Sequence, residues 1–331
     1  SNLALNIWII VLLIYSYTAS ILPVNIILQP RDYLSTFILF FGLICGYLGL
    51  MLTRPQINTP AFLGWTAKQG PLFPMLFVFI ACGAVSGFHS LISSGTTVKQ
   101  LDNEKNALKI GYGAMLLEGA LAVLALLSVT AGLSWINKEG TGCPVYPELL
   151  KTGDWIGTFS AGYGRVVSKI LGITFGCLVA TITLNSFVMT TLDTATRITR
   201  YITEEFFGKG LKIKIFNNRF FSTSIVIFFA GYLAFGNWKA IWPVFGASNQ
   251  LIAAIALIVV SLWLIGQKKS AFFSGLPGIF VFLVTVSALL YQSFVFLNQK
   301  NNLLFVISII LVFLSFFILF EVYSFLKNRP K

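Results

Sequence analysis

The chain has 331 residues, of which 56% are hydrophobic and only 10% are charged, and its mean hydropathy is +0.84. A soluble domain carries about 25% charged residues, so this composition excludes a soluble enzyme, a disordered chain and a disulfide-stapled secreted domain. The formal net charge of +12 fits the excess of Lys and Arg in the cytoplasmic loops of membrane proteins. We therefore expect an all-α polytopic transmembrane helical bundle.

Nine stretches are apolar over the roughly 20 residues that a helix needs to cross a bilayer. In chain order they are 3–22, 34–52, 71–92, 107–136, 166–192, 222–237, 243–265, 276–298 and 303–326. The sixth is short and runs almost directly into the seventh, so these two could form one hairpin or a partly re-entrant segment.

The distribution of Lys and Arg predicts the orientation. Fifteen lie in the loops on one side and seven in those on the other, and the positive-inside rule places the richer side, with the C-terminus, in the cytoplasm. The longest loop on the opposite side, 137–165, is expected to be an ordered surface loop. The chain begins without Met inside an apolar run, which we interpret as a fragment or a trimmed product rather than a signal peptide.

The cysteines and two GxxxG pairs are expected to be packing positions rather than chemical sites. No CxxC or Cys/His spacing suggests a metal, and no nucleotide-binding motif is present, so we expect no metal and no cofactor, and transport driven by a gradient or by a partner's ATP. The packing positions are Cys45, Cys82, Cys177, Gly42, Gly46, Gly172 and Gly176.

Glu118 is the clearest ionisable residue inside a predicted span. It lies about 16 Å along the 107–136 helix at 1.5 Å per residue, close to the membrane midplane. Small residues at helical spacing, among them Gly111 and Ala122, would let another helix approach. A buried carboxyl of this kind suits a proton carrier, and a structural carboxyl hydrogen-bonded between helices is an equal alternative.

A second candidate is a polar stripe on one helix face. Thr183, Ser186, Thr190, Asp193 and Arg197 follow one another at spacings of three and four residues. Asp193 and Arg197 are expected to form an i, i+4 salt bridge near the cytoplasmic end. The stripe continues inward, which suggests a helix that faces a water-filled path.

A third candidate is the segment 83–97, which contains His89, the one histidine of the chain, and three glycines that loosen the helix. A lone His is more often a hydrogen-bonded structural residue than a ligand. A discontinuous helix, however, exposes backbone groups that bind substrate or ions. The hydroxyls near His89 belong to Ser86, Ser90, Ser93, Ser94 and Thr96.

A fourth candidate is 243–250, where Pro243 and Gly246 are expected to break a span beside Ser248, Asn249 and Gln250. The alternative is a proline kink whose backbone groups are satisfied by neighbouring helices.

Several of these segments resemble the carbon starvation protein A (CstA) family of bacterial transporters. The resemblance rests on Leu22-Pro23 and on the strings at 28–37, 81–97, 111–119, 191–201 and 241–251, in order along nearly the whole chain. It implies an amino acid–polyamine–cation type of transporter fold with broken helices. It also implies that 1–140 is the C-terminal part of the main transmembrane domain and 150–331 a five-helix C-terminal module. Family members are usually longer, so missing N-terminal spans of the same protein are an implied partner.

Members of that family are linked to peptide uptake under carbon starvation and to proton-coupled pyruvate uptake. The resemblance therefore implies a secondary transporter in the bacterial inner membrane that takes up a small carboxylate or short peptides. Protons are the expected coupling ion and sodium the alternative, with Glu118 as the carrier. His89 and its hydroxyls would face the substrate, and the stripe from Thr183 to Arg197 would line the cytoplasmic exit. Besides lipid, substrate and ion, we expect no nucleic-acid partner.

Three other functions were weighed. A channel would show rings of charge or a filter loop, and neither is visible. An intramembrane serine hydrolase could pair His89 with Ser86 or Ser93 on one helix face, but no oxyanion-hole motif accompanies them. A sensory module would feed a cytoplasmic domain, and the sequence contains none.

Overall fold

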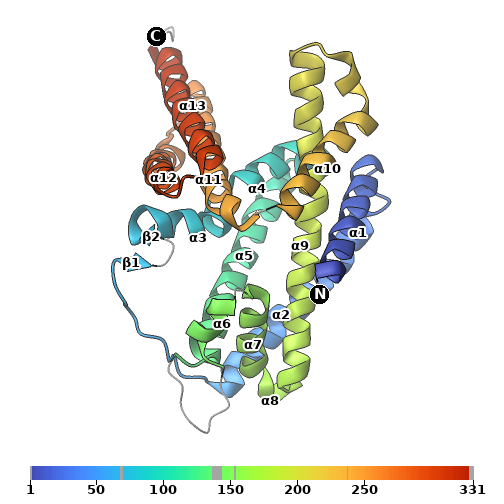
Figure 1. The fold of residues 1–331 in the computed structure, drawn as a ribbon, viewed down its shortest axis with the longest axis vertical. Helices are drawn as coiled ribbons and strands as arrows, with labels where there is room; N and C mark the ends of the chain where they lie inside the picture. The colour runs from blue at the N-terminus through green and yellow to red at the C-terminus, as the bar shows by residue number, and fades with distance from the viewer. Residues whose placement is uncertain (1, 68–69, 136–143, 153, 237, 328–331) are drawn as a thin grey trace. The chain divides into compact units, whose positions relative to one another are not determined.

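The computed structural model describes residues 2–67, 70–135, 144–152, 154–236 and 238–327 (Figure 1). The α-helices are α1 (Asn2–Ile21), α2 (Leu28–Thr53), α3 (Phe77–Ala84), α4 (Gly87–Ile92), α5 (Lys105–Gly132), α6 (Tyr146–Thr152), α7 (Trp155–Val166), α8 (Ser168–Leu171), α9 (Ile173–Thr203), α10 (Arg219–Phe235), α11 (Trp238–Gly266), α12 (Phe272–Asn298) and α13 (Asn302–Lys327). Tighter or wider helical turns are η1 (Leu72–Leu76), η2 (Ser93–Thr97), η3 (Val98–Gln100), η4 (Glu204–Gly210) and η5 (Lys214–Asn217). Two short strands, β1 (Thr66–Ala67) and β2 (Gly70–Pro71), pair antiparallel.

The expected all-α membrane fold is confirmed. Among the described residues, seven helices are long and apolar enough to cross a bilayer: α1, α2, α5, α9 with its continuation to Gly210, α11, α12 and α13. The other two predicted spans differ. The stretch 71–92 is divided into η1, α3 and α4, and α10 is apolar but only 17 residues long.

The described chain divides into two compact units, and each is built from two separate stretches of sequence. One unit comprises Ser1–Leu63 and Asn103–Phe235, and the other comprises Gly64–Asp102 and Gly236–Lys331. Segment 64–102 therefore packs with the C-terminal helices and not with its sequence neighbours. The expected modules 1–140 and 150–331 were drawn from a resemblance and stay a prediction.

In the first unit, α9 is the long central helix. Its 31 residues span about 46 Å at 1.5 Å per residue, and the ribbon shows α1 and α10 beside it. Toward the start of α9, buried apolar side chains from α2, α5, α7 and α9 form one core cluster. Its members are Leu43, Leu124, Tyr163, Val166, Val167, Val179 and Ala180.

The predicted surface loop 137–165 is wrong over the part that the structure describes. That part contains α6 (Tyr146–Thr152) and most of α7 (Trp155–Val166). The Asp154 side chain caps the start of α7 by accepting a hydrogen bond from the Gly157 amide at 2.7 Å. The small residues that suggested a loop allow close packing instead: a Cβ on Gly162 would run into the carbonyl of Ser128 on α5. Glycine there is a packing requirement.

Three of the four GxxxG glycines are confirmed as close-packing positions. A Cβ on Gly42 would lie 3.1 Å from Thr183 Oγ1, one on Gly46 would meet Leu124 and Tyr163, and one on Gly176 would meet Gly164. Gly172 differs, since it stands before α9 at φ +74° with no other group near it among the described atoms. Its role is conformational, because a positive φ favours glycine.

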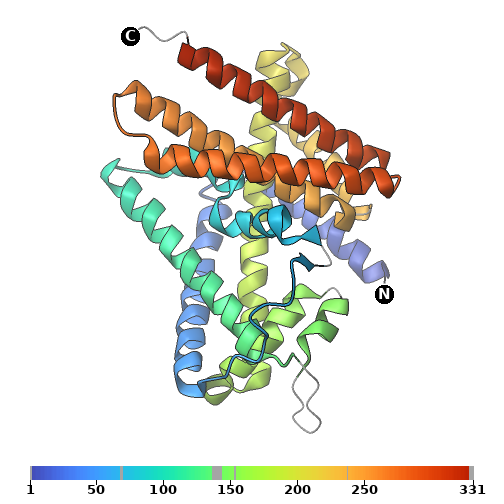
Figure 2. The ribbon, with the colours of Figure 1, turned by 90° about the vertical axis from the view of Figure 1, so that its left-hand side faces the viewer.

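In the second unit, α11 packs against α3, α4, α12 and α13. Figure 2 shows α12 and α13 as two long helices side by side. Buried residues from η1, α3, α11, α12 and α13 form its main apolar contacts: Met75, Val78, Ala247, Ala288, Leu289 and Val312. The break predicted at 243–250 is wrong, because α11 is continuous from Trp238 to Gly266. Pro243 is the sixth residue of α11, and the helix continues through it.

We predict that Gly162→Ala destabilises the first unit, because the added methyl group meets backbone that cannot move aside. Overpacking of this kind costs about 1–3 kcal/mol, which thermal unfolding in detergent would register as a lower Tm. Gly113→Ala is the matched control, since a Cβ at Gly113 on α5 has nothing within 4 Å among the described atoms. Equal Tm values for the two variants would contradict this packing.

Candidate functional site: a buried ion-pair network

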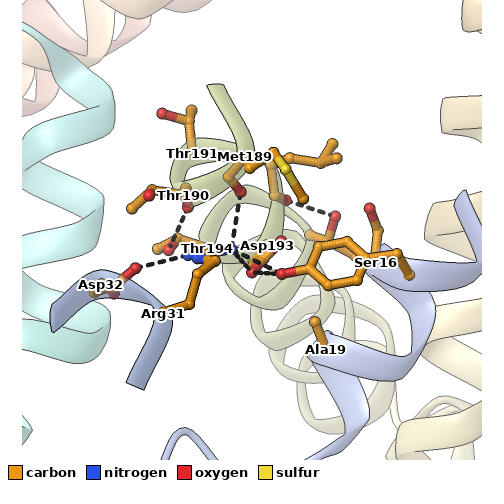
Figure 3. A network of polar contacts seen from close by, with 12 residues as sticks. Ser16, Ala19, Arg31, Asp32, Met189, Thr190, Thr191, Asp193 and Thr194 are labelled. Atoms are coloured by element: carbon orange, nitrogen blue, oxygen red, sulfur yellow. Dashed lines mark hydrogen bonds and ion pairs between the residues drawn. The ribbon is translucent and has the colours of Figure 1, made fainter. Parts of the chain in front are cut away.

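Arg31 joins two helices in the first unit (Figure 3). Its Nη1 forms an ion pair with Asp193 Oδ2 on α9 and donates to the Met189 carbonyl at 3.2 Å. Its Nη2 lies 2.7 Å from Asp32 Oδ1. One guanidinium therefore serves two carboxylates, and it holds the start of α2 against the middle of α9.

Asp193 is the most deeply buried charged group of this network, with 0% of its side chain exposed. Its Oδ2 also accepts a hydrogen bond of 2.8 Å from the Tyr15 hydroxyl of α1, so three helices meet at this carboxylate. Its Oδ1 is buried and has no hydrogen-bond partner, and the same holds for Nε of Arg31. A buried ion pair is held only if good geometry offsets the cost of removing both charges from water. In this pair one hydrogen-bond acceptor, Asp193 Oδ1, and one donor, Arg31 Nε, have no partner among the described residues.

Arg197 does not form the predicted salt bridge with Asp193. Its Nη2 instead donates to the carbonyls of Ala19 and Leu22, the second at 2.7 Å. These carbonyls lie at the end of α1. The carbonyls in the last turn of a helix have no amide donor within the helix. A cation placed there also interacts favourably with the helix dipole. The prediction failed because both charges found partners on other helices.

The rest of the polar stripe packs against neighbouring helices. Thr183 is 7% exposed and lies against Gly42 of α2. Its hydroxyl donates to the Val179 carbonyl one turn back, and Thr190 does the same to Ser186, at 2.8 and 2.9 Å. The hydroxyls of Thr183 and Thr190 are therefore satisfied within α9. Its role as the lining of a cytoplasmic exit stays a prediction.

The predicted break in segment 83–97 is present in the second unit. The helix stops after Ala84 and restarts at Gly87, and Asn249 of α11 fills the gap. Asn249 Oδ1 accepts from the Phe88 amide at 2.7 Å and from the Ser86 hydroxyl at 3.4 Å. A Cβ on Gly87 would collide with the backbone of α11. The side-chain amide of Asn249, on another helix, therefore satisfies the backbone at the break. Asn249 is one of the candidate residues from the sequence.

The hydroxyls around His89 bond to backbone of their own segment. Ser90 donates to the Gly87 carbonyl at 2.7 Å, Ser94 to Ser90 at 2.9 Å and Thr96 to Ile92 at 3.0 Å. His89 is exposed, as are Ser93 and Ser94. The contact of these hydroxyls and of His89 with substrate stays a prediction.

The other residues at 243–250 divide by burial. The hydroxyl of Ser248 is half-buried and donates to the Val244 carbonyl at 2.8 Å. Gln250 is 3% exposed, and its Oε1 is buried with no hydrogen-bond partner. Asn249 is the one whose side chain joins α11 to another helix.

Glu118 is exposed on α5, where a buried carboxyl was expected. The small-residue face around it is open, since Cβ atoms on Gly111 and Gly119 would meet nothing within 4 Å among the described atoms. The face is therefore accessible to another helix, as the sequence indicated. The role of Glu118 as a proton carrier stays a prediction.

Sequence reasoning missed Arg31 and Tyr15. The predicted span began at residue 34, which put Arg31 in a loop, because Pro30 was taken to lie outside the helix. In the structure α2 begins at Leu28, and proline is tolerated in the first turn of a helix. The adjacent Arg-Asp pair at the mouth of a span was the available signal. Nothing in the sequence marked Tyr15.

The described residues contain no group of three or more His, Cys, Asp or Glu side chains that could hold a metal ion. The contacts of the network are ion pairs and hydrogen bonds. A guanidinium with a spare donor can hold an anion, and a buried carboxylate can change its charge when its partner moves.

Comparison with known proteins identifies relatives of the chain. A family model described as carbon starvation protein CstA matches residues 2–137 and 147–288. The peptide transporter CstA of Campylobacter jejuni is 31% identical over 84% of this chain and 47% of its own length. The pyruvate/proton symporter BtsT of Escherichia coli is 32% identical over 83% of this chain and 49% of its own. The chain spans about half the length of the curated relatives it matches. No solved structure matches.

We predict that Arg31→Gln is strongly destabilising, because it leaves the Asp193 carboxylate buried without a counter-charge. Loss of one partner from a buried pair costs about 3–5 kcal/mol, measured as a loss of Tm in detergent. Asp32→Asn should cost under about 1 kcal/mol, because the Asp32 side chain is 44% exposed and water screens it. The double variant Arg31→Gln/Asp193→Asn should recover part of the loss, and a purely additive result would contradict the pairing.

Asn249→Ala should lower Tm, because it leaves the Phe88 amide unsatisfied at the break between α3 and α4. A buried donor without a partner costs about 1–3 kcal/mol. Ser248→Ala, the neighbouring residue on α11, removes only a hydrogen bond within its own helix and should change Tm little. If both variants melt alike, Asn249 does not hold the break.

Proposed function

Because the chain belongs to the carbon starvation protein CstA family, we propose that it forms the carrier, or part of the carrier, for secondary active uptake of a small carboxylate or short peptides. The observation that supports this most strongly is similarity along more than four fifths of the chain to two relatives with different printed substrates, peptides and pyruvate. Pyruvate and the C-terminus of a peptide share a carboxylate. A carboxylate is therefore the feature that one binding site would recognise in both.

The driving force that we propose is a proton gradient, with a sodium gradient as the alternative. The pyruvate relative is a proton symporter by name, and the sequence contains no nucleotide-binding motif. Glu118 is the proton carrier that we propose from the sequence. His89 and the hydroxyls near it would face the substrate, and the Thr183–Arg197 stripe would line the cytoplasmic exit.

We propose the bacterial inner membrane as the location, with the C-terminus in the cytoplasm. The chain is a multi-pass membrane protein by its helices and by its transporter relatives. The support for the orientation is the excess of Lys and Arg, fifteen against seven, in the loops on the C-terminal side.

Transport is favoured over catalysis and over a channel. The hydroxyls of Ser86 and Ser90 form hydrogen bonds with Asn249 and with the Gly87 carbonyl, and no oxyanion-hole motif accompanies them in the sequence. For a channel, no ring of charge or filter loop was visible in the sequence.

We propose that further transmembrane segments complete the transport path. The relatives are about twice as long as the chain, and an alternating-access carrier moves one group of helices against another around its site. The open face of α5 around Glu118, with Gly111 and Gly119, is where such a segment would pack.

Uptake of labelled pyruvate and dialanine into right-side-out membrane vesicles tests the function. The chain is expressed with any residues that flank it in its gene, and in parallel as residues 1–331 alone. We expect accumulation by the first preparation only when the outside is more acidic, and none by residues 1–331 alone. Absence of uptake of both substrates under every gradient would contradict the proposal, and coupled uptake by residues 1–331 alone would show that no further segment is needed.

We predict that Glu118→Gln abolishes pH-driven accumulation but leaves exchange of substrate across the membrane, because the amide cannot carry a proton. Glu104→Gln, just before the start of α5, is the matched control and should accumulate substrate as the wild type does. Accumulation by the Glu118→Gln variant with the pH dependence of the wild type would show that Glu118 is not the carrier.

A further inference from the structure

We propose that Arg31 binds the carboxylate of the substrate and that Asp193 takes up a proton when it does so. The proposal rests on the proposed function, since it requires that the substrate carries a carboxylate. It names a binding group and a protonation site that lie in one network within the first unit.

The first argument is the balance of charge. Arg31 already faces two carboxylates, Asp32 and Asp193. A substrate carboxylate would be the third negative group beside one guanidinium, in a region where Asp193 has no access to water. Such an excess of buried negative charge is relieved when one carboxylate takes up a proton. Arg31 itself stays charged, because a guanidinium does not release its proton in proteins.

The second argument is the pair of unused polar atoms. Nε of Arg31 is a buried donor without an acceptor, and Oδ1 of Asp193 is a buried acceptor without a donor. A substrate carboxylate supplies an acceptor for the guanidinium, and a proton supplies what the aspartate lacks. Asp32 is 44% exposed, the Arg31 side chain 19% and Asp193 0%, so of the Arg31–Asp193 pair the guanidinium is the group that an anion can reach.

The third argument is that Tyr15 can hold the proton in place. Its hydroxyl now donates to Asp193 Oδ2 at 2.8 Å. The same hydroxyl oxygen accepts from Arg31 Nη1 at 2.9 Å. A hydroxyl is both a donor and an acceptor, so once Arg31 turns away Tyr15 can rotate its proton and accept from a protonated Asp193. The step adds one proton from water to one carboxylate and breaks no covalent bond. As Arg31 turns toward the substrate, its ion pair with Asp193 is replaced by this neutral hydrogen bond.

Among the charged groups near Asp193, Arg31 is the counter-charge whose ion pair with Asp193 can break. Arg197, one turn further along α9, is bound to the Ala19 and Leu22 carbonyls. From α10, which also packs against α9, the ionisable residues are Arg219 at its start and Tyr232, which is 72% exposed. Helices α7 and α8 bring Arg165 and Lys169 to the beginning of α9, about 25 Å from Asp193 along the helix.

Isothermal titration calorimetry with pyruvate tests the proposal on the purified protein, expressed with any flanking residues of its gene. Titrations in buffers of different ionisation enthalpy give the number of protons taken up per pyruvate bound. We expect about one for the wild type, so affinity should fall about tenfold per pH unit on the alkaline side of the transition. Arg31→Lys, which keeps the charge but loses the planar fork, should weaken binding at least tenfold.

Asp193→Asn mimics the protonated aspartate and gives the sharpest result. It should bind pyruvate at pH 8 as tightly as the wild type does in acid, with no proton uptake. Asp32→Asn, the matched change on the exposed carboxylate that shares Arg31, should keep the uptake of one proton. If Asp193→Asn does not fold, Tyr15→Phe serves instead: it removes a hydrogen-bond partner of the Asp193 carboxyl group, so the pH dependence of binding should shift.

The outcomes separate this inference from the proposed function. Pyruvate binding with no proton uptake in the wild type, or with undiminished uptake in Asp193→Asn, overturns the role of Asp193 and leaves a carboxylate transporter standing. Unchanged affinity and pH dependence in Tyr15→Phe would likewise overturn it. Unchanged affinity in Arg31→Lys overturns the role of Arg31. Absence of binding of both pyruvate and dialanine by the folded wild type contradicts the proposed function and this inference together.

Discussion

A carboxylate without access to water must be compensated by the protein around it, and in the first unit this constraint connects three helices. Asp193 on α9 draws Tyr15 from α1 and Arg31 from α2, and Arg197 one turn later holds the end of α1. The apolar core of the unit lies further toward the start of α9, in the contacts with α5 and α7. Charge thus fixes one part of the central helix and glycine-mediated packing fixes the other.

The second unit meets a related constraint without charge. Interrupting the helix between Ala84 and Gly87 frees backbone groups that hydrocarbon cannot satisfy. Asn249 supplies the missing partner from α11, and Gly87 allows the approach that its side chain requires. An uncharged amide keeps this contact independent of pH, whereas the network in the first unit is built from groups that titrate. The contact at the break is therefore insensitive to protonation, whereas the carboxylates of the first unit carry a charge that protonation removes.

Composition and hydropathy predicted the helical membrane fold because bilayer length and apolarity constrain every residue of a span. The break at 83–97 was also predictable, since its glycines and hydroxyls are local features. The partners of Asp193 and Arg197 were not predictable. Their spacing is ideal for an i, i+4 salt bridge, yet each side chain binds a group on another helix. Arg31 was not recognised because the predicted span began at residue 34, six residues after α2 begins at Leu28. The closeness of α7 to α5 could not be inferred either, because the small residues that permit it are the same ones that suggest a loop.

The discontinuous composition of the two units has a consequence for biosynthesis. Residues 64–102 pack with helices of which the first, α11, begins at Trp238, so a ribosome must add residues 103–237, 135 in all, before those helices start. At about 5–20 residues per second, this interval lasts roughly 7–27 s. During this interval the interrupted helix between Ala84 and Gly87 is in the membrane or the translocon without Asn249. Its free backbone groups then need another hydrogen-bond partner. The insertion machinery, lipid headgroups or water must supply that partner until α11 is synthesised.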